Sequence, residues 1–402
     1  MINFAPPRID EKIIEAVSET LRSGWITTGP KTKLLEKKIS EYCGMKQTLC
    51  INSATAGLEL ALRWFGVGQG DEVILPAYTY AATANVVIHC GAKPVLVDVN
   101  KNDFCISQEA IEKAITEKTK VIMPVDFGGL PCDYNAIMDI VEKAKSKFKA
   151  ATANQEKLGR ILVLSDAAHS LGATYKGKNA GTLTDITVFS FHAVKNLTTA
   201  EGGAMLFNLP KSFDDAAIYK ELSITSLHGQ TKDAMAKMQK GNWKYDIVEA
   251  GYKCNMTDLA ATMGLIELER YKDDTLLKRK AIVGAYSIFF ANEKWAELPI
   301  SREKDRESSY HLFALRIKNI TEEQRDKIIQ KIFDKDVAVN VHFIPIPMMS
   351  FYKNMGYKIT DYPVTYDNFS REISLPVYYD LTMEQVAIVC NAVKESVEES
   401  IK

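Results

Sequence analysis

The sequence has few cysteines and no pairing pattern among them. Its 402 residues include seven cysteines and six histidines. The cysteines are odd in number and widely spaced, without a C-x-x-C pair, and the histidines show no ligand spacing. Disulfide frameworks are typical of small secreted domains, and zinc sites need closely spaced ligands. We therefore expect reduced thiols and no metal site.

The chain also lacks an excess of charge of either sign. Fifty Lys and Arg residues face 51 Asp and Glu residues, which gives a formal net charge of -1. Binding of nucleic acid or of an anionic membrane by bulk charge requires a basic patch or stripe. The composition thus favours neither a nucleic acid nor a membrane as partner.

Long apolar runs are missing too. No segment is apolar and uncharged for long enough to span a bilayer, and residues 1–7 lack the apolar core of a signal peptide. We expect a cytoplasmic protein. With 46% hydrophobic residues, a chain of this length can bury a large core and most simply forms two domains.

Short apolar runs alternate with helical stretches from about residue 46 onward. This alternation is typical of an α/β domain with a largely parallel sheet. The predicted helices cover residues 54–65, 81–90, 107–115 and 134–147. The seven predicted strands cover residues 47–52, 72–76, 94–99, 120–125, 161–166, 185–191 and 204–208.

The pattern changes in the last third of the chain. A long helical stretch is predicted from residue 258 to about 290, and shorter strands and helices follow. This change predicts a large α/β domain over residues 1–265 and a smaller α+β domain over residues 266–402. Residues 143–160 are basic and contain several alanines, and we interpret them as a helix end that runs into a solvated insertion.

Polar segments follow four of the predicted strands. In open α/β sheets, ligands bind beyond the carboxyl ends of the strands. We therefore expect these segments to meet at one edge of the sheet. They are residues 52–55, 77–80, 166–169 and 190–195.

Lys195 lies on the connection between the last two predicted strands, among aromatic residues and glycines. A lone lysine on a loop is usually a solvated surface charge. Burial, however, lowers the pKa of a lysine and favours the free amine that attacks carbonyl groups. This setting makes Lys195 the candidate for a reactive amine.

The run from Ser190 to Gly203 reads S-F-H-x-x-K-N-x-x-x-x-E-G-G. It resembles the Schiff-base loop of the DegT/DnrJ/EryC1/StrS sugar aminotransferases, which use pyridoxal phosphate. Similar motifs extend the resemblance over nearly the whole chain. They lie at residues 23–30, 52–57, 166–169, 251–255 and 374–376. The resemblance implies a fold-type-I aminotransferase with a seven-stranded, mostly parallel sheet and a smaller α+β C-terminal domain.

The same resemblance implies contacts with the cofactor ring. Asp166 would pair with the protonated ring nitrogen, which would offset the cost of a carboxylate at the end of an apolar strand. The alternative is an aspartate that caps the next turn. His169 would contact the phenolic oxygen or the ring face, and Tyr80 would stack on the ring. Without the resemblance, either would more often be a core residue.

A phosphate site is expected where residues 52–57 open a helix, because free N–H groups at a helix start bind phosphate. Ser53 or Thr55 could instead serve only as the N-cap, and the two roles are compatible. By resemblance, Ala54 and Thr55 contact the phosphate and Ser190 adds a hydroxyl. Asn255 resembles a residue that reaches the phosphate from a partner subunit, which implies a homodimer with shared active sites.

The substrate side is assigned by resemblance alone. His311 and His342 match family motifs that line it, with a plain structural role as an equal alternative. Trp25 and Thr27 are further candidates, for the sugar-nucleotide entrance. Two departures from the family pattern, Ser165 and residues 226–229, bear on the donor or nucleotide subsite and not on the reaction.

The sequence thus predicts an aminotransferase whose catalytic residues are Lys195, Asp166 and His192. Lys195 would hold pyridoxal phosphate, glutamate would convert it to the pyridoxamine form, and Lys195 would then act as general acid and base. The acceptor would be a UDP- or dTDP-linked keto sugar, and the product an amino sugar nucleotide for surface polysaccharide or lipid modification.

Relatives that act at C4 of the sugar more often show His-x-x-Lys followed by Glu-Gly-Gly, so His192 favours a 4-keto acceptor. Within the family, the sequence resembles members that aminate the 4-keto sugar on the way to 4-amino-4-deoxy-L-arabinose. The alternatives are a 3-keto sugar aminotransferase, a dehydratase of the same fold, in which histidine replaces the lysine, and a regulatory ligand sensor. The chain shows no basic helix-turn-helix appendage that would support the sensor.

Overall fold

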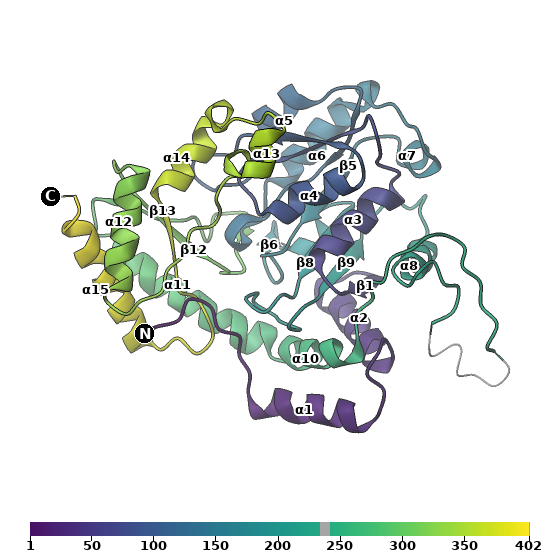
Figure 1. The fold of residues 1–402 in the computed structure, drawn as a ribbon, viewed down its shortest axis with the longest axis horizontal. Helices are drawn as coiled ribbons and strands as arrows, with labels where there is room; N and C mark the ends of the chain where they lie inside the picture. Colours follow the sequence, from purple (N-terminus) through teal and green to yellow (C-terminus); the bar gives the residue numbers. More distant parts are fainter. Residues whose placement is uncertain (234–241, 402) are drawn as a thin grey trace.

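A seven-stranded sheet forms the centre of the larger part of the molecule (Figure 1). The computed structural model describes residues 1–233 and 242–401. The strand order is β1-β9-β8-β5-β4-β2-β3, and only β9 runs antiparallel to its neighbours. This confirms the predicted strands and the mostly parallel sheet. Their bounds are Thr48–Ile51 (β1), Glu72–Pro76 (β2), Lys93–Val97 (β3), Thr119–Ile122 (β4), Leu162–Asp166 (β5), Ile186–Ser190 (β8) and Gly203–Phe207 (β9).

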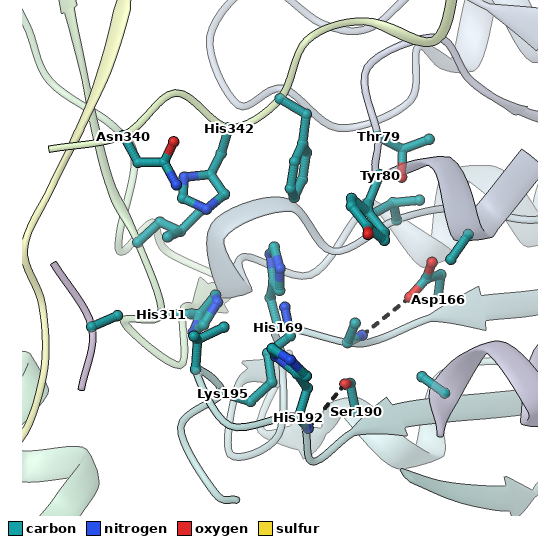
Figure 2. Close-up of a pocket in the computed structure, with 18 of the residues that line it drawn as sticks. Thr79, Tyr80, Asp166, His169, Ser190, His192, Lys195, His311, Asn340 and His342 are labelled. Carbon is teal, nitrogen blue, oxygen red and sulfur yellow. Dashed lines mark hydrogen bonds between the residues drawn. The ribbon is translucent and has the colours of Figure 1, made fainter. Parts of the chain in front are cut away.

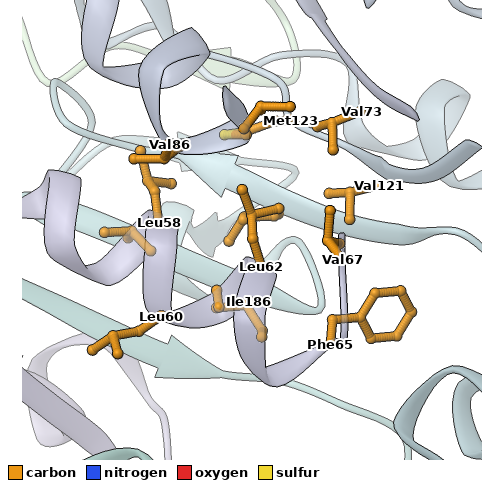
Figure 3. Close-up of a cluster of buried hydrophobic side chains, with 14 of the residues drawn as sticks. Leu58, Leu60, Leu62, Phe65, Val67, Val73, Val86, Val121, Met123 and Ile186 are labelled. Atoms are coloured by element: carbon orange, nitrogen blue, oxygen red, sulfur yellow. The ribbon is translucent and has the colours of Figure 1, made fainter. Parts of the chain in front are cut away.

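Helices cover both faces of this sheet. Alternate side chains of a strand point to opposite faces, and here the side chains on both faces are apolar and have to be buried. On one face, α3 (Ala54–Trp64) and α4 (Ala81–His89) pack on Val73, Val121 and Met123 (Figure 3). On the other, Ile74 and its neighbours pack against α5 (Gln108–Ala114) and α6 (Tyr134–Lys143). The latter face also contacts α2 (Pro30–Cys43) and α10 (Asp258–Glu269). Two-sided cover explains why these strands are apolar along their whole length.

A second unit with its own core follows α10. It contains an antiparallel sheet of β10 (Ala296–Glu297), β12 (Phe313–Ile317) and β13 (Glu372–Leu375). Its main helices are α11 (Leu276–Phe290), α12 (Glu322–Phe333), α14 (Pro363–Arg371) and α15 (Met383–Glu398). The predicted helical stretch over 258–290 is thus α10 and α11, joined by a π-helical turn at Tyr271–Thr275. Ile2 packs in the core of this C-terminal unit and forms a β-bridge with Val337. The domain boundary near residue 265 stays a prediction.

Smaller elements complete the described chain. They are helices α1 (Glu11–Arg22), α8 (Asp215–Thr225) and α13 (Ser350–Asn354), and a sheet of β6 (Thr174–Tyr175), β7 (Lys178–Asn179) and β11 (Arg306–Glu307). Within the described residues, no helix is both long and apolar enough to cross a membrane.

The prediction of a solvated insertion at residues 143–160 is wrong for its second half. A short helix, α7 (Ala153–Leu158), buries the side chain of Gln155, whose Nε2 donates to the carbonyl of Phe65 at 3.0 Å. Arg160 is also buried and forms two 2.7 Å hydrogen bonds with the Asp185 carboxylate. An amide and an ion pair anchor this segment, so it carries little of the apolar periodicity that marks a packed element.

Candidate active site

A cavity of about 560 Å³ lies at the carboxyl ends of the sheet strands (Figure 2). The four polar segments expected to meet there all contribute to its lining. The opposite wall comes from the C-terminal unit and the N-terminus, and it includes His311, residues 340–343, Val377 and Phe4. The site is therefore enclosed between the large sheet and the second unit.

Lys195 projects into this cavity from the loop between β8 and β9. Its backbone N–H donates to the carbonyl of His192 at 2.9 Å, which makes a tight turn after β8. Burial lowers the pKa of Lys195 to about 8, and the negative charge of Asp166 opposes that shift. At pH 7 roughly a tenth of this amine is unprotonated, far more than for an ordinary lysine, and the free amine is the form that acts as a nucleophile.

The next residue, Asn196, fixes this loop to the C-terminal unit. Its Nδ2 donates to the carbonyl of Ser309 at 2.7 Å, and its Oδ1 accepts from Nδ1 of His311 at 2.8 Å. Asn196 is itself buried. The backbone that carries Lys195 is therefore held from both units.

Asp166 ends β5 with only 6% of its surface exposed. Its carboxylate accepts from Thr83 Oγ1 at 2.8 Å and from the backbone N–H of Ala168 at 3.3 Å. Burial raises the pKa of this carboxyl group. In the described structure both donors are neutral and no ion pair is formed, so the site favours a cationic N–H partner.

Thr83 and Asp126, two neighbours of Asp166, escaped the sequence analysis. The hydroxyls of Thr79 and Thr83 lie 2.8 Å apart, which extends the chain of hydrogen bonds from Asp166 along the start of α4. Asp126 is a second buried carboxylate, and it accepts 2.6 Å hydrogen bonds from Ser170 and Tyr134. Burial raises the pKa of Asp126 to about 6, and the charge of Asp166 adds to that shift. The only sequence signal for Asp126 is its position after β4.

His169 and His311 form a pair of neutral imidazoles, with ring centroids 4.2 Å apart. The backbone N–H of Gly128 donates to Nδ1 of His169 at 3.3 Å, so the ring proton of His169 belongs on Nε2. Burial holds the pKa of both histidines well below the usual value, and the charge of Lys195 acts in the same direction. Both rings are neutral near pH 7.

His342 lies across the cavity and stacks on Phe4 at 5.5 Å. Its Nδ1 donates to Ser374 Oγ at 2.9 Å, because that hydroxyl donates in turn to Glu372. Burial lowers the pKa of His342 to about 3, with a further contribution from the charge of Lys195. The Nε2 atom of this neutral ring is left as an acceptor.

The start of α3 lies at the cavity. Ser53 is its N-cap and accepts from the N–H of Ala56 at 3.2 Å. The first N–H groups of a helix have no intrahelical partner, and Ala54 and Thr55 line the cavity here. A Cβ on Gly203 would lie 2.7 Å from the Ala54 nitrogen, so glycine is what allows β9 to approach the helix start. Ser190 also lines the cavity (Figure 2).

Tyr80 and His192 also line the cavity, and both are exposed. The Tyr80 side chain has 64% of its surface free, and its ring lies 5.8 Å from that of Phe343. It is therefore not a core residue, which leaves its face available to a planar ligand. His192 Nε2 lies 3.6 Å from a Glu201 carboxylate oxygen.

Three predicted site residues do not line this cavity. Asn255 donates to the hydroxyl of Thr28, and Trp25 Nε1 donates to the Thr28 carbonyl at 3.3 Å. The Thr27 carbonyl accepts from the N–H of Asp258 at 3.2 Å. These residues lie near the start of α2, and their contacts with cofactor and sugar nucleotide stay predictions.

The donor set suits pyridoxal phosphate. An amine, a buried carboxylate without a cation, a helix start and an open aromatic ring surround one space. Among the described residues, no cluster of His, Cys, Asp and Glu has the arrangement of a metal site.

Residues 7–394 match the DegT/DnrJ/EryC1/StrS aminotransferase family. The chain belongs to this family. Spore coat polysaccharide biosynthesis protein SpsC of Bacillus subtilis is 36% identical, over 98% of this chain and 97% of its own. UDP-4-amino-4-deoxy-L-arabinose--oxoglutarate aminotransferase of Shewanella sediminis is 34% identical, over 97% of both chains.

Solved structures of this family agree with the fold. The putative sugar aminotransferase Spr1654 of Streptococcus pneumoniae in its PMP form is 48% identical, with a TM-score of 0.96 and full coverage of both chains. Its PLP form gives the same TM-score. The chain is thus a sugar aminotransferase of fold type I that depends on pyridoxal phosphate, which confirms the predicted fold, enzyme class and cofactor.

Proposed function

We propose that this aminotransferase moves the amino group of glutamate to the keto carbon of a nucleotide-linked 4-keto sugar. The observation that carries the proposal is the placement of Lys195. Its amine, with a pKa of about 8, shares one cavity with the buried Asp166 carboxylate and the start of α3. A UDP- or dTDP-linked sugar is the proposed acceptor.

The residues around the cavity divide the binding of pyridoxal phosphate among them. Lys195 would hold the aldehyde carbon, and Asp166 would hold the proton on the ring nitrogen. Tyr80 and His169 would contact the ring. The phosphate would bind at Ala54, Thr55 and Ser190, where N–H groups and a hydroxyl are available. When bound, the cofactor supplies an electron sink for the amino transfer.

Once its amine is free, Lys195 would carry the proton at the reacting carbon of the substrate. A pKa of about 8 lets the same nitrogen accept and donate near neutral pH. His169, His311 and His342 remain neutral there. His311 and His342 would orient substrate polar groups, and none of the three rings adds charge that would compete with Lys195.

The position of the carbonyl is proposed from His192, three residues before Lys195. The name of the Shewanella sediminis relative places its amino group at C4 of a UDP-linked sugar, and that of SpsC concerns polysaccharide biosynthesis. The first name supports a 4-amino sugar nucleotide as product, and the second supports its use in a surface polysaccharide. The retained Lys195 argues against a dehydratase of the same fold.

We further propose a homodimer with shared sites. Asn255, Trp25 and Thr27 lie outside the cavity of their own chain, so a second copy would have to bring them to it. This arrangement would complete the phosphate site and the entrance for the sugar nucleotide.

The proposal is tested with purified protein, glutamate and a panel of UDP- and dTDP-linked 4-keto and 3-keto sugars. We expect release of 2-oxoglutarate with a 4-keto sugar and a new amine at C4 by NMR. An amine at C3 would refute the proposed position. Absence of 2-oxoglutarate with every keto sugar would refute the glutamate-dependent reaction and favour the sensor alternative.

A further inference from the structure

Arg279 is a buried cation that the proposed reaction has not used. It lies on α11, lines the cavity together with Lys195 and His311, and exposes only 5% of its surface. Its Nε donates to the carbonyl of Tyr310 at 3.0 Å, and its Nη2 donates to the carbonyl of His311 at 2.8 Å. Neither bond uses Nη1.

No carboxylate of the described chain forms an ion pair with this guanidinium. Burial lowers the pKa of Arg279 to about 10, and the only opposing contribution comes from Tyr271. A buried charge held by backbone carbonyls alone is costly, and an anion that binds it repays part of that cost. The geometry therefore suits a site that an anionic ligand completes.

The position of Arg279 relative to the reactive amine is fixed. Arg279 donates to the backbone carbonyl of His311. The His311 ring in turn forms a hydrogen bond with Asn196, which follows Lys195 in sequence. Figure 2 shows His311 and Ser190 on opposite sides of Lys195. The cation is thus tied, through His311 and Asn196, to the loop that carries Lys195.

The chemistry of the ligand follows from the Nη1 nitrogen of Arg279, which neither of the two hydrogen bonds to backbone carbonyls uses. One guanidinium nitrogen in a nearly closed setting suits a single carboxylate group. A nucleotide diphosphate carries more charge and needs several donors, and it is separated from the reacting carbon by the sugar ring. Glutamate carries its carboxylates close to the amine that reacts.

We propose that Arg279 is a specificity-determining residue that binds a carboxylate of the amino donor. This inference rests on the proposed use of an amino acid donor and adds the residue that selects it. Because donor and keto sugar occupy the cavity in turn, Arg279 would act in the donor half-reaction only.

The test is a titration of the pyridoxal phosphate-loaded protein with maleate, a dicarboxylate that has no amine to react. We expect Arg279→Gln to weaken maleate binding roughly 10- to 100-fold, as for loss of one charge-assisted hydrogen bond. The matched control is Arg325→Gln. Arg325 is equally buried and donates to the Phe369 carbonyl at 2.7 Å, but it does not line the cavity. This control should bind maleate like the parent protein.

A second readout separates the two half-reactions. Conversion of the bound cofactor to the pyridoxamine form by glutamate, followed by absorbance, should slow in Arg279→Gln at subsaturating glutamate. The second half-reaction, in which the keto sugar takes the amino group, should keep its rate. If Arg279→Gln does not fold, Arg279→Lys retains a cation of shorter reach and should show the same selective loss.

Equal maleate binding in the folded Arg279 variant and the parent protein would overturn the inference while leaving the proposed function intact. Weaker UDP binding with unchanged maleate binding would also overturn it and assign Arg279 to the nucleotide. If the parent protein binds maleate but glutamate does not convert its bound cofactor to the pyridoxamine form, glutamate is refuted as the donor. The carboxylate site at Arg279 would still stand.

Discussion

Nδ1 of His311 donates to Oδ1 of Asn196 across 2.8 Å and so joins the loop of Lys195 to the C-terminal unit. We expect Asn196→Ala to lower kcat by about tenfold or more, because the loop loses this bond and the one to Ser309. The measurement is steady-state release of 2-oxoglutarate. Asn208→Ala, on an exposed asparagine bonded to the Thr182 carbonyl, is the control.

A double-variant cycle tests whether Asn196 and His311 act as a unit. Residues in contact show non-additive effects, so the pair Asn196→Ala and His311→Ala should cost less together than the sum of the two free energies. Full additivity would show that the 2.8 Å contact has no role in placing Lys195.

Asp166→Asn should fold and yet lose several orders of magnitude in rate. A neutral amide cannot hold the ring-nitrogen proton, and a charge-assisted hydrogen bond alone is worth about 1.5–3 kcal/mol. Thr83→Val removes only the 2.8 Å hydroxyl donor to Asp166, and we expect a loss of about tenfold. Turnover of Asp166→Asn near that of the parent protein would remove this carboxylate from the mechanism.

The lowered pKa of Lys195 predicts a distinct pH dependence in the cofactor-free protein. Well below pH 8 the amine is mostly protonated and unreactive, so its labelling by trinitrobenzenesulfonate should rise through a midpoint near pH 8 and then level off. The ordinary pKa of a lysine is 10.5. Because the charge of Asp166 raises this pKa, Asp166→Asn should move the midpoint lower. Peptide mass spectrometry gives the midpoint, and a value near 10.5 would contradict the burial argument.

The shared-site proposal predicts complementation between two inactive variants. Lys195→Ala lacks the amine, and Asn255→Ala lacks the residue proposed to reach the partner's phosphate. A mixed dimer contains one intact site, so activity should return on mixing. No activity after demonstrated subunit exchange would mean that each site is built from one chain.

The strands and the cavity edge were predictable because they depend on local pattern. A fully buried strand such as β5 is a continuous apolar run, and its end places Asp166 at the sheet edge. The loop of Lys195 carries a motif of its own. For both, nearby sequence determines the structure.

Contacts between distant parts of the chain were not predictable in this way. Arg279 meets the carbonyls of Tyr310 and His311 only after α11 packs against β12 and the residues just before it. From sequence alone, an arginine on a helix indicates a solvent-exposed face. The buried amide of Gln155 donates to the carbonyls of Phe65 and Gly66 and accepts from the N–H of Ala151. Polar contacts of this kind leave no periodic signal.

The central claim is that Lys195 is the amine that holds the cofactor. The direct measurement is borohydride reduction of the pyridoxal phosphate-loaded protein, followed by digestion and mass spectrometry. We expect the cofactor mass on the peptide that contains Lys195, and no fixed label in Lys195→Ala, which should still bind the cofactor at the phosphate site without turning over. Label recovered on a different lysine of the parent protein would contradict the account.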